Sequence, residues 1–137
     1  LFLLAGRYTL LEQEALQSFL PLCASRGIGI VTGGPYNSGI LATGAVPGAF
    51  YNSDPAADSI LKKVASIEEI CRQYSTPLKA AALQFPLLHP THLSVIPGGQ
   101  NVEEMKSNFE AFHFEIPEGL WGSLKDARLI HPDSVTG

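Results

Sequence analysis

Three short apolar runs, each closed by a glycine-containing turn, constrain the fold of this chain more than any other feature. The runs and the residues that close them are 1–5 with Gly6, 28–32 with Gly33, and 93–96 with Pro97 and Gly98. They do not alternate with polar residues, which is typical of strands covered on both faces in a parallel sheet. Because helical patterns separate the runs and no hairpin signal occurs, the sequence predicts an α/β fold of parallel βα units.

The segments between and after these runs carry apolar residues at helical spacing. Five helices are predicted. The first covers residues 10–26, the second begins at Asp54-Pro55, and the third begins at Thr76-Pro77 and ends before Pro86. The fourth begins at Asn101 and the fifth at Pro117. Thr9 with Glu12, and Asn101 with Glu104, have the spacing of a capping box. Residues 36–54 are rich in Gly, Asn, Ser and Pro and lack a period, so we expect an ordered loop whose length favours a functional role.

Three parallel strands leave two sheet edges without hydrogen-bonding partners. We therefore expect residues 1–137 to be the carboxyl-terminal portion of one (β/α)8 TIM barrel, with an open doubly wound sheet as the alternative. The chain starts at Leu1, without an initiator Met, inside a strand-like run, which we interpret as a cut through a larger domain. The rest of the barrel is then the expected partner, and self-association is expected if the chain exists alone.

Charge and hydropathy exclude two classes of partner. The formal net charge is -4, and the nine Lys and Arg residues are scattered rather than clustered, with only Lys62 and Lys63 adjacent, so no basic face is offered to nucleic acid. The longest apolar stretches fall far short of the roughly 20 residues of a membrane-spanning helix, so we expect no membrane interaction. Cys23 and Cys71 lie on apolar helix faces and are predicted to be buried thiols rather than a disulfide, which favours a cytoplasmic location.

No pattern in the chain predicts a metal site or a nucleophilic serine. His89, His92, His113 and His131 lack the spacing of metal ligands, and we expect them in surface loops. Ser38 has no GxSxG elbow around it. Metal-dependent and serine hydrolase chemistry are therefore not expected from these residues.

Glycine-rich loops follow the second and third runs, where ligands bind in parallel sheets. Gly33, Gly34 and Gly39 flank Tyr36, Asn37 and Ser38, and Gly98 and Gly99 precede Gln100 and Asn101. Glycines let backbone amides approach a ligand, and a helix amino-terminus has unpaired N–H groups, so phosphate is the expected ligand. A tight turn explains either loop alone, but their pairing on successive βα units favours phosphate binding.

Arg7 and Tyr8 follow the first run and are candidate substrate contacts. Strand ends in a barrel face the active site, so either side chain could touch a substrate there. The alternative is that they cap a helix or pack in the core.

Three segments resemble the aldo-keto reductase family. Residues 34–41 are similar to its Ser-Pro-Leu-x-x-Gly-x-Leu loop, residues 94–98 to its last strand, and residues 103–109 to the helix that follows. Residues 3–11 are especially similar to the sugar-oxidising branch of the family, which holds D-threo-aldose (L-fucose) and pyridoxal dehydrogenases. The resemblance extends from the sixth barrel strand to the carboxyl-terminal helix.

The resemblance implies that the two glycine-rich loops bind a nicotinamide dinucleotide. Tyr36, Asn37 and Ser38 would lie along its pyrophosphate, Gly98 to Asn101 around the adenosine ribose, and Asn108 at the adenine. The implied cofactor-binding set is Gly33, Gly34, Tyr36, Asn37, Ser38, Gly39, Pro97, Gly98, Gly99, Gln100, Asn101, Glu104 and Asn108. Gly33 and Ala5 stand where many members have a stacking aromatic and a Gln, so the nicotinamide contacts must differ from the usual pattern.

Glu104 favours NAD over NADP. Members that prefer NADP place Lys near Gly98 and Arg near Glu104, where both contact the ribose 2'-phosphate. Glu104 instead repels a phosphate and can accept a hydrogen bond from a ribose hydroxyl. We therefore expect NAD to be preferred, with NADP possible, although Glu104 also completes a capping box with Asn101 without any cofactor.

The implied activity is hydride transfer between NAD(P) and a small-molecule carbonyl or sugar, such as an aldose or another alcohol and aldehyde pair. The family's catalytic Tyr, Lys, Asp and His belong to the first half of its barrel. We therefore expect no catalytic residue in this chain and no activity from it alone. The alternatives are a non-catalytic nucleotide-sensing or assembly module and another phosphate-binding barrel enzyme, such as an isomerase.

Overall fold

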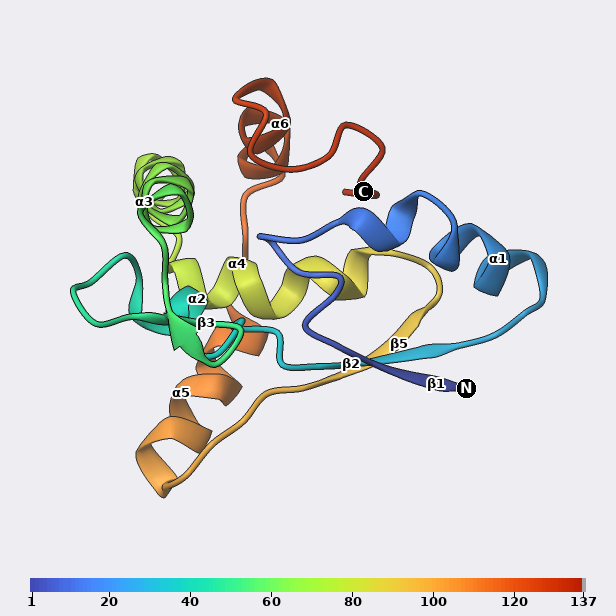
Figure 1. Cartoon of the computed structure of the whole chain (residues 1–137), viewed down its shortest axis with the longest axis horizontal. Coiled ribbons are helices and arrows are strands. Elements are labelled where there is room, and N and C mark those ends of the chain that lie inside the picture. Colours follow the sequence, from blue (N-terminus) through green and yellow to red (C-terminus); the bar gives the residue numbers. More distant parts are fainter. Residues whose placement is uncertain (137) are drawn as a thin grey trace.

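A parallel sheet lies at the centre of the fold. The computed structural model describes residues 1–136, and within them a three-stranded sheet has the order β1-β2-β5. Its strands are β1 (Phe2–Ala5), β2 (Ile30–Gly33) and β5 (His92–Ile96). Both pairings of the central strand β2 are parallel, so all three strands end at the same edge (Figure 1). The prediction of parallel βα units is confirmed.

Helices cover one face of this sheet. In chain order they are η1 (Glu14–Leu16), α1 (Phe19–Ser25), α2 (Ile40–Thr43), α3 (Asp58–Gln73), α4 (Leu78–Gln84), η2 (Phe85–Leu88), α5 (Val102–His113) and α6 (Gly119–Asp126). Helix α4 lies between the sheet and the pair formed by α3 and α6 (Figure 1). The core lies in this layer and includes the apolar side of α6, where Leu120, Trp121 and Leu124 are buried as the helical spacing predicted.

The helix predicted over residues 10–26 is wrong in its first half. Thr9 forms a compact turn, in which its amide donates to the Glu12 carbonyl at 2.8 Å and its Oγ1 accepts from the amides of Leu11 and Glu12, each at 3.2 Å. Residues 8–11 are all buried. One helix could not direct four consecutive side chains into the same core, so the chain crosses the core before η1 and α1 begin.

The start predicted at Asp54-Pro55 is also wrong, because these residues form a strand. Strands β3 (Phe50–Tyr51) and β4 (Asp54–Pro55) pair in an antiparallel hairpin, and α3 begins only at Asp58. The hairpin turn, Asn52-Ser53, has positive φ at both residues, 52° and 66°, which suits the right-handed twist of a two-residue hairpin. The ordered loop predicted over residues 36–54 therefore contains this hairpin and the short helix α2.

The predicted N-cap at Asn101 is present, and the reciprocal bond of the capping box is displaced by one residue, to Gln100. Asn101 Oδ1 accepts from the Glu104 amide at 2.9 Å, and the Glu104 carboxylate accepts from the Gln100 amide at 2.7 Å. One amide of the first turn of α5 and the amide of Gln100, which precedes the cap, are thereby satisfied. Helix α5 begins directly after Asn101.

A group of aromatic and imidazole rings lies in the core, which corrects the surface placement expected for two histidines. Tyr8 has no exposed surface, stacks on Phe85 with ring centroids 5.2 Å apart, and lies 5.0 Å from the His92 ring. His89 and His92 are both buried, and Thr91 Oγ1 lies within hydrogen-bonding distance of Nδ1 of each, at 2.8 and 3.2 Å. Burial lowers the pKa of His92 to about 4 and raises that of Tyr8 to about 12.

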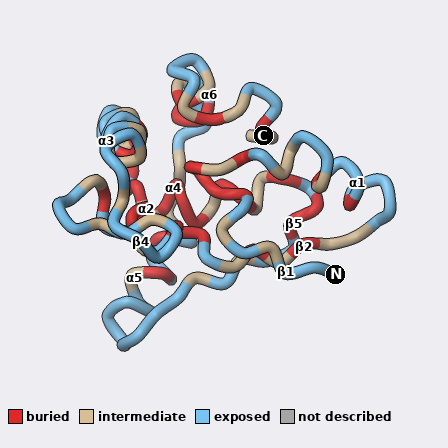
Figure 2. Tube along the Cα trace, viewed as in Figure 1, coloured by how far each residue is buried: buried red, intermediate tan, exposed pale blue. Residues whose placement is uncertain are grey.

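Two groups of apolar side chains are open to solvent. Figure 2 shows exposed stretches of the chain, which include much of β1, in pale blue. One group lies on the sheet face away from the helices, where Leu3 and Leu93 are each 67% exposed and Ile96 is 55% exposed. The other, the α5 stripe, consists of Val102, Met105, Phe109 and Phe112. The apolar runs predicted a sheet that is covered on both faces. Within residues 1–136, only one face of the sheet is covered. In a closed barrel the other face would line the interior.

Both cysteines are free thiols in the core, as predicted for Cys23 and Cys71. Among residues 1–136, no helix combines the length and apolar character needed to cross a membrane. The same residues hold no group of three or more His, Cys, Asp or Glu side chains arranged to bind a metal ion.

We predict that acid destabilises the fold through His92. Its pKa in the folded state is about 4, below the ordinary value of about 6.5, so only the unfolded chain takes up its proton between these pH values. This contribution to stability is therefore complete above about pH 6.5 and declines as the pH falls to about 4, by about 3 kcal/mol in all. Urea unfolding of His92→Phe at pH 7 and pH 5 should show a smaller pH effect than the unsubstituted protein. The exposed His113→Phe variant is the control, and equal pH effects in both variants would contradict the prediction.

We also predict that a polypeptide of residues 1–137 alone self-associates through its open apolar surfaces. Sedimentation should give a mass above the 14.7 kDa of one chain. Leu93→Lys combined with Phe109→Lys should reduce association, because the charges lie on the sheet face and the α5 stripe. Val46→Lys, at an exposed apolar residue outside both surfaces, should have little effect. A monodisperse unsubstituted monomer would show that the prediction is wrong.

Candidate functional site

The two glycine-rich loops lie beside each other at the carboxyl edge of the sheet. Gly33, the last residue of β2, pairs in register with Ile96, the last residue of β5. The β2 loop (residues 34–39) and the β5 loop (residues 97–101) therefore leave the sheet at adjacent points, as the sequence predicted. Parallel α/β folds bind their ligands at this edge.

Asn108 joins the two loops. Its Oδ1 accepts a hydrogen bond from the Tyr36 hydroxyl at 2.9 Å, and its Nδ2 donates to the Gly98 carbonyl at 3.0 Å. Tyr36 is 8% exposed and Asn108 4% exposed. Burial raises the pKa of Tyr36 to about 12, so the phenol remains a donor at neutral pH. Asn108, for which the family resemblance implies a contact with adenine, fixes the separation of the two loops in this structure.

The β2 loop has an unusual backbone. Asn37, Ser38 and Gly39 have consecutive positive φ angles of 48°, 63° and 101°. Residues other than glycine take up this conformation at a cost and do so most often at functional sites, Asn more readily than most. Asn37 Nδ2 donates to the Gly6 carbonyl at 3.4 Å. The buried Oδ1 of Asn37 has no hydrogen-bond partner among residues 1–136. An unsatisfied buried acceptor in a strained loop is typical of a ligand or water site.

The hairpin behind the β2 loop holds it from the other side. Ser38 Oγ accepts from the Ser53 amide at 2.9 Å, so the predicted site residue Ser38 is tied to the turn of β3 and β4. The sequence did not anticipate this contact, because the hairpin itself was not predicted. The β2 loop is therefore braced by Gly6, Ser53 and Asn108.

The β5 loop is the open side of the site. Gly98, Gly99, Gln100 and Asn101 are exposed, and a shallow cavity beside them is lined by Gly99, Asn101, Met105, Lys106 and Phe109, among others. The Glu104 carboxylate lies at the Gln100 amide, where it places a negative charge at the start of α5. A ligand group that enters here meets backbone amides, an acid and the apolar side chains of α5.

Lys79 is a residue of this region that the sequence analysis missed. Its Nζ donates to Ser107 Oγ at 2.8 Å and lies 5.4 Å from the centre of the Tyr36 ring. A cation over an aromatic face is attracted by the ring quadrupole. Lys79 therefore helps to hold Tyr36 against α5. No sequence signal marks it, because its partners come from two other elements.

Arg7 and Tyr8, the predicted substrate contacts, point in different directions. Tyr8 lies in the core, away from any surface. Arg7 is exposed and forms an ion pair with Glu12 at 3.2 Å, and Glu12 also accepts a hydrogen bond from the Tyr51 hydroxyl. Of the two, only Arg7 is accessible to a ligand in this structure, and Tyr51 of the hairpin adjoins it through Glu12.

Comparison with known proteins identifies relatives. The family model "Aldo/keto reductase family" matches residues 2–128. A D-threo-aldose 1-dehydrogenase from a Pseudomonas species is 42% identical over 131 residues, which cover 95% of this chain and 40% of that protein. A pyridoxal 4-dehydrogenase from Microbacterium luteolum is 38% identical over 128 residues, which cover 93% of this chain and 37% of that protein. The chain thus spans about two fifths of the length of these curated relatives.

A solved structure shares the fold. The holo form of an aldo-keto reductase from Bacillus halodurans superposes with a TM-score of 0.68 at 20% identity, covering 96% of this chain and 43% of that chain. The predicted fold, part of a TIM barrel, is confirmed by this likeness. The resemblance to the sugar-oxidising branch is supported by the two dehydrogenases. With a family model matched over nearly its whole length, the chain belongs to the aldo/keto reductase family.

Proposed function

We propose that this chain forms the cofactor-binding part of an oxidoreductase that transfers a hydride between NAD(P) and a small carbonyl or alcohol. The observation that carries the proposal is the pair of loops at the carboxyl edge, joined through Asn108 to Tyr36 and Gly98. The relatives that are named for aldose and pyridoxal oxidation support an aldose, or another alcohol and aldehyde pair, as substrate.

The residues present fit a dinucleotide. In our proposal, Tyr36, Asn37 and Ser38 hold the pyrophosphate between the flanking glycines of the β2 loop. The unpartnered Asn37 Oδ1 would accept from a water that bridges to the pyrophosphate. The β5 loop holds the adenosine ribose. Asn108 acts mainly as a positioning residue, because its amide is engaged by both loops. When bound, the nicotinamide supplies the hydride acceptor or donor.

The proton that accompanies hydride transfer is proposed to come from residues outside this chain. Of the four tyrosines, Tyr8 and Tyr36 are buried with pKa values raised to about 12. Tyr51 donates to Glu12, and burial with that carboxylate raises its pKa to about 12 as well. Tyr74 shares a hydrogen bond with Ser123. Burial or an existing hydrogen bond thus engages each of the four, whereas a proton donor must reach the substrate.

The proposed partners are small molecules and the remainder of the barrel. The exposed sheet face and the α5 stripe are the surfaces against which further barrel elements would pack. The free buried thiols of Cys23 and Cys71 support a reducing compartment, so we propose a cytoplasmic location.

The proposed function is tested with the whole protein that contains this chain. It should reduce NAD when supplied with a D-threo-aldose, as followed by nicotinamide absorbance, and it should bind NAD without substrate. Binding without turnover of any aldose or aldehyde would favour a nucleotide-sensing module. An absence of nicotinamide binding would refute the proposal and favour another kind of phosphate-binding barrel.

Glu104 is proposed to make NAD the preferred cofactor. Its carboxylate lies at the Gln100 amide in the β5 loop, on the side of the site assigned to the adenosine ribose. A carboxylate there accepts from a ribose hydroxyl and repels a 2'-phosphate. The capping role and the cofactor role are compatible, because the Gln100 amide engages only Oε2 of the carboxylate.

We predict that Glu104→Gln narrows the preference for NAD over NADP by about tenfold in kcat/KM, mainly through a lower KM for NADP. The amide side chain keeps an acceptor for the Gln100 amide, so the cap is retained while the charge is lost. Glu103→Gln, one residue earlier on the same exposed helix turn, removes the same charge and should leave the ratio nearly unchanged. An unsubstituted enzyme that clearly favours NADP would refute the prediction.

A further inference from the structure

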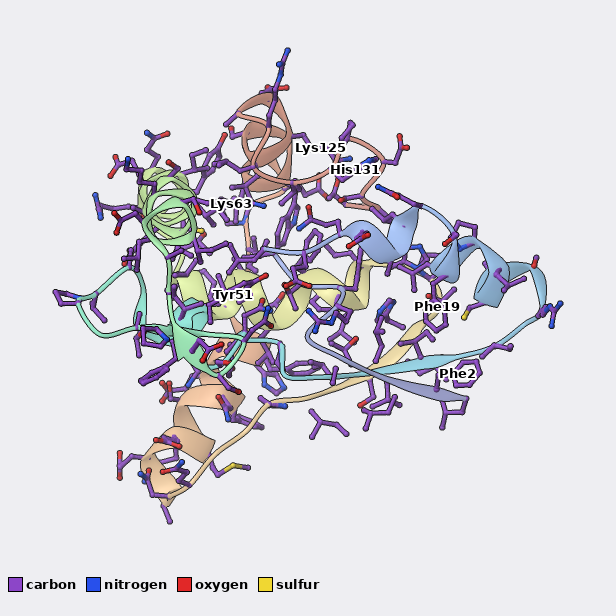
Figure 3. The ribbon with its side chains drawn as sticks, in the orientation of Figure 1. Phe2, Phe19, Tyr51, Lys63, Lys125 and His131 are labelled. Carbon is purple, nitrogen blue, oxygen red and sulfur yellow. The ribbon has the colours of Figure 1, made fainter. Side chains whose placement is uncertain are left out.

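A second cleft lies on the helical side of the molecule, away from the two loops. It is formed by α3, the end of α6 and the carboxyl-terminal segment (residues 127–136), and its volume is about 520 Å3. Four basic side chains line it: Lys63, Lys125, Arg128 and His131. Figure 3 shows Lys63 on α3 on one side, with Lys125 and His131 across from it.

The fold holds the walls of this cationic cleft in place. Gln13, which is buried, donates through Nε2 to the Thr9 carbonyl at 2.6 Å and accepts at Oε1 from the His131 amide at 3.1 Å. The Leu129 amide donates to the Leu124 carbonyl at 3.0 Å, which turns the chain back at the end of α6. Hydrogen bonds that involve the backbone thus fix the positions of the walls of the cleft.

The charges in the cleft are not balanced. Asp126 is the one acid among its lining residues, and within residues 1–136 no carboxylate lies within 4.0 Å of Lys63, Lys125 or Arg128. His131 approaches only the exposed Asp133, at 3.9 Å. A concentration of unpaired cations is unexpected in a chain with a net charge of -4, and it focuses an attractive field on small anions.

Lys63 is fixed in the cleft by a hydrogen bond to the backbone. The Nζ atom donates to the Leu11 carbonyl at 3.0 Å and is half-buried. Burial lowers the pKa of Lys63, while Glu12 partly opposes this effect. Loss of hydration disfavours the charged amine, and an anion in the cleft would restore its stabilisation.

We propose that the cationic cleft binds a phosphate group through Lys63, Lys125 and Arg128. The phosphate is either free or part of a phosphorylated small molecule. An adjoining cleft shares Lys63, Gln13 and His131 and extends to Arg7 and Tyr51. Glu12 and Glu14 also line it, so there is room beyond the phosphate for a polar substituent without negative charge. This inference goes beyond the proposed function and does not depend on it.

The test uses the whole protein saturated with NAD, so that the dinucleotide site does not compete for the probe. Calorimetric titrations with inorganic phosphate, ribose 5-phosphate and ribose are compared. Phosphate and ribose 5-phosphate should bind and ribose should not. Tighter binding of ribose 5-phosphate would assign a phosphorylated ligand, and equal binding would assign free phosphate. If the protein does not bind NAD, the same titrations without it still test the cleft.

Lys125→Gln and Arg128→Gln should each weaken phosphate binding about tenfold, because each removes one charge-assisted hydrogen bond. Lys62→Gln is the matched control, since Lys62 neighbours Lys63 on α3 but is exposed and does not line the cleft. It should change the affinity less than about twofold, as expected for a screened surface charge. Thermal unfolding of each variant verifies that the fold is retained. No phosphate binding, or equal losses in Lys62→Gln and Lys125→Gln, would overturn the proposal.

Discussion

The central strand β2 is hydrogen-bonded on both sides, to β1 and to β5, and the other elements take their places from that pairing. Because the pairing is parallel, each strand must be followed by a segment that returns to the opposite edge, and helices provide these returns. The same geometry brings every strand-to-helix loop to one edge. The β2 loop and the β5 loop therefore meet there, although Tyr36 and Asn108 are 72 residues apart in the sequence.

The fold was largely predictable where local signals agree with burial. The three apolar runs became the three strands, and Asn101, which accepts from the Glu104 amide, became the N-cap of α5. Thr9 with Glu12 has the same spacing yet starts no helix, because the core takes up every side chain from Tyr8 to Leu11. The hairpin turn Asn52-Ser53 lacks glycine, so its signal in the sequence is weak although its backbone is left-handed at both residues.

The candidate site was predictable in its location but not in its internal connections. Glycine after a strand shows where a loop begins, and the family likeness gives those loops a ligand. Neither shows that the Asn108 amide is engaged by Tyr36 and Gly98, or that Lys79 lies over the Tyr36 ring. The burial of His89 and His92 was missed for a similar reason. It depends on the distant ring of Tyr8, and a single polar residue in a sequence carries no sign of such a neighbour.

The hydrogen bonds of Asn108 also bear on the order in which the protein assembles. A contact between residues 72 positions apart closes a long segment of chain, and the entropy lost in that closure must be offset by contacts formed elsewhere first. We therefore expect the site at the carboxyl edge to form late in folding, after β2, α4 and α5 have packed. A dinucleotide that contacts both loops would bind the native state and not the unfolded chain. Its binding would therefore raise the free energy of unfolding.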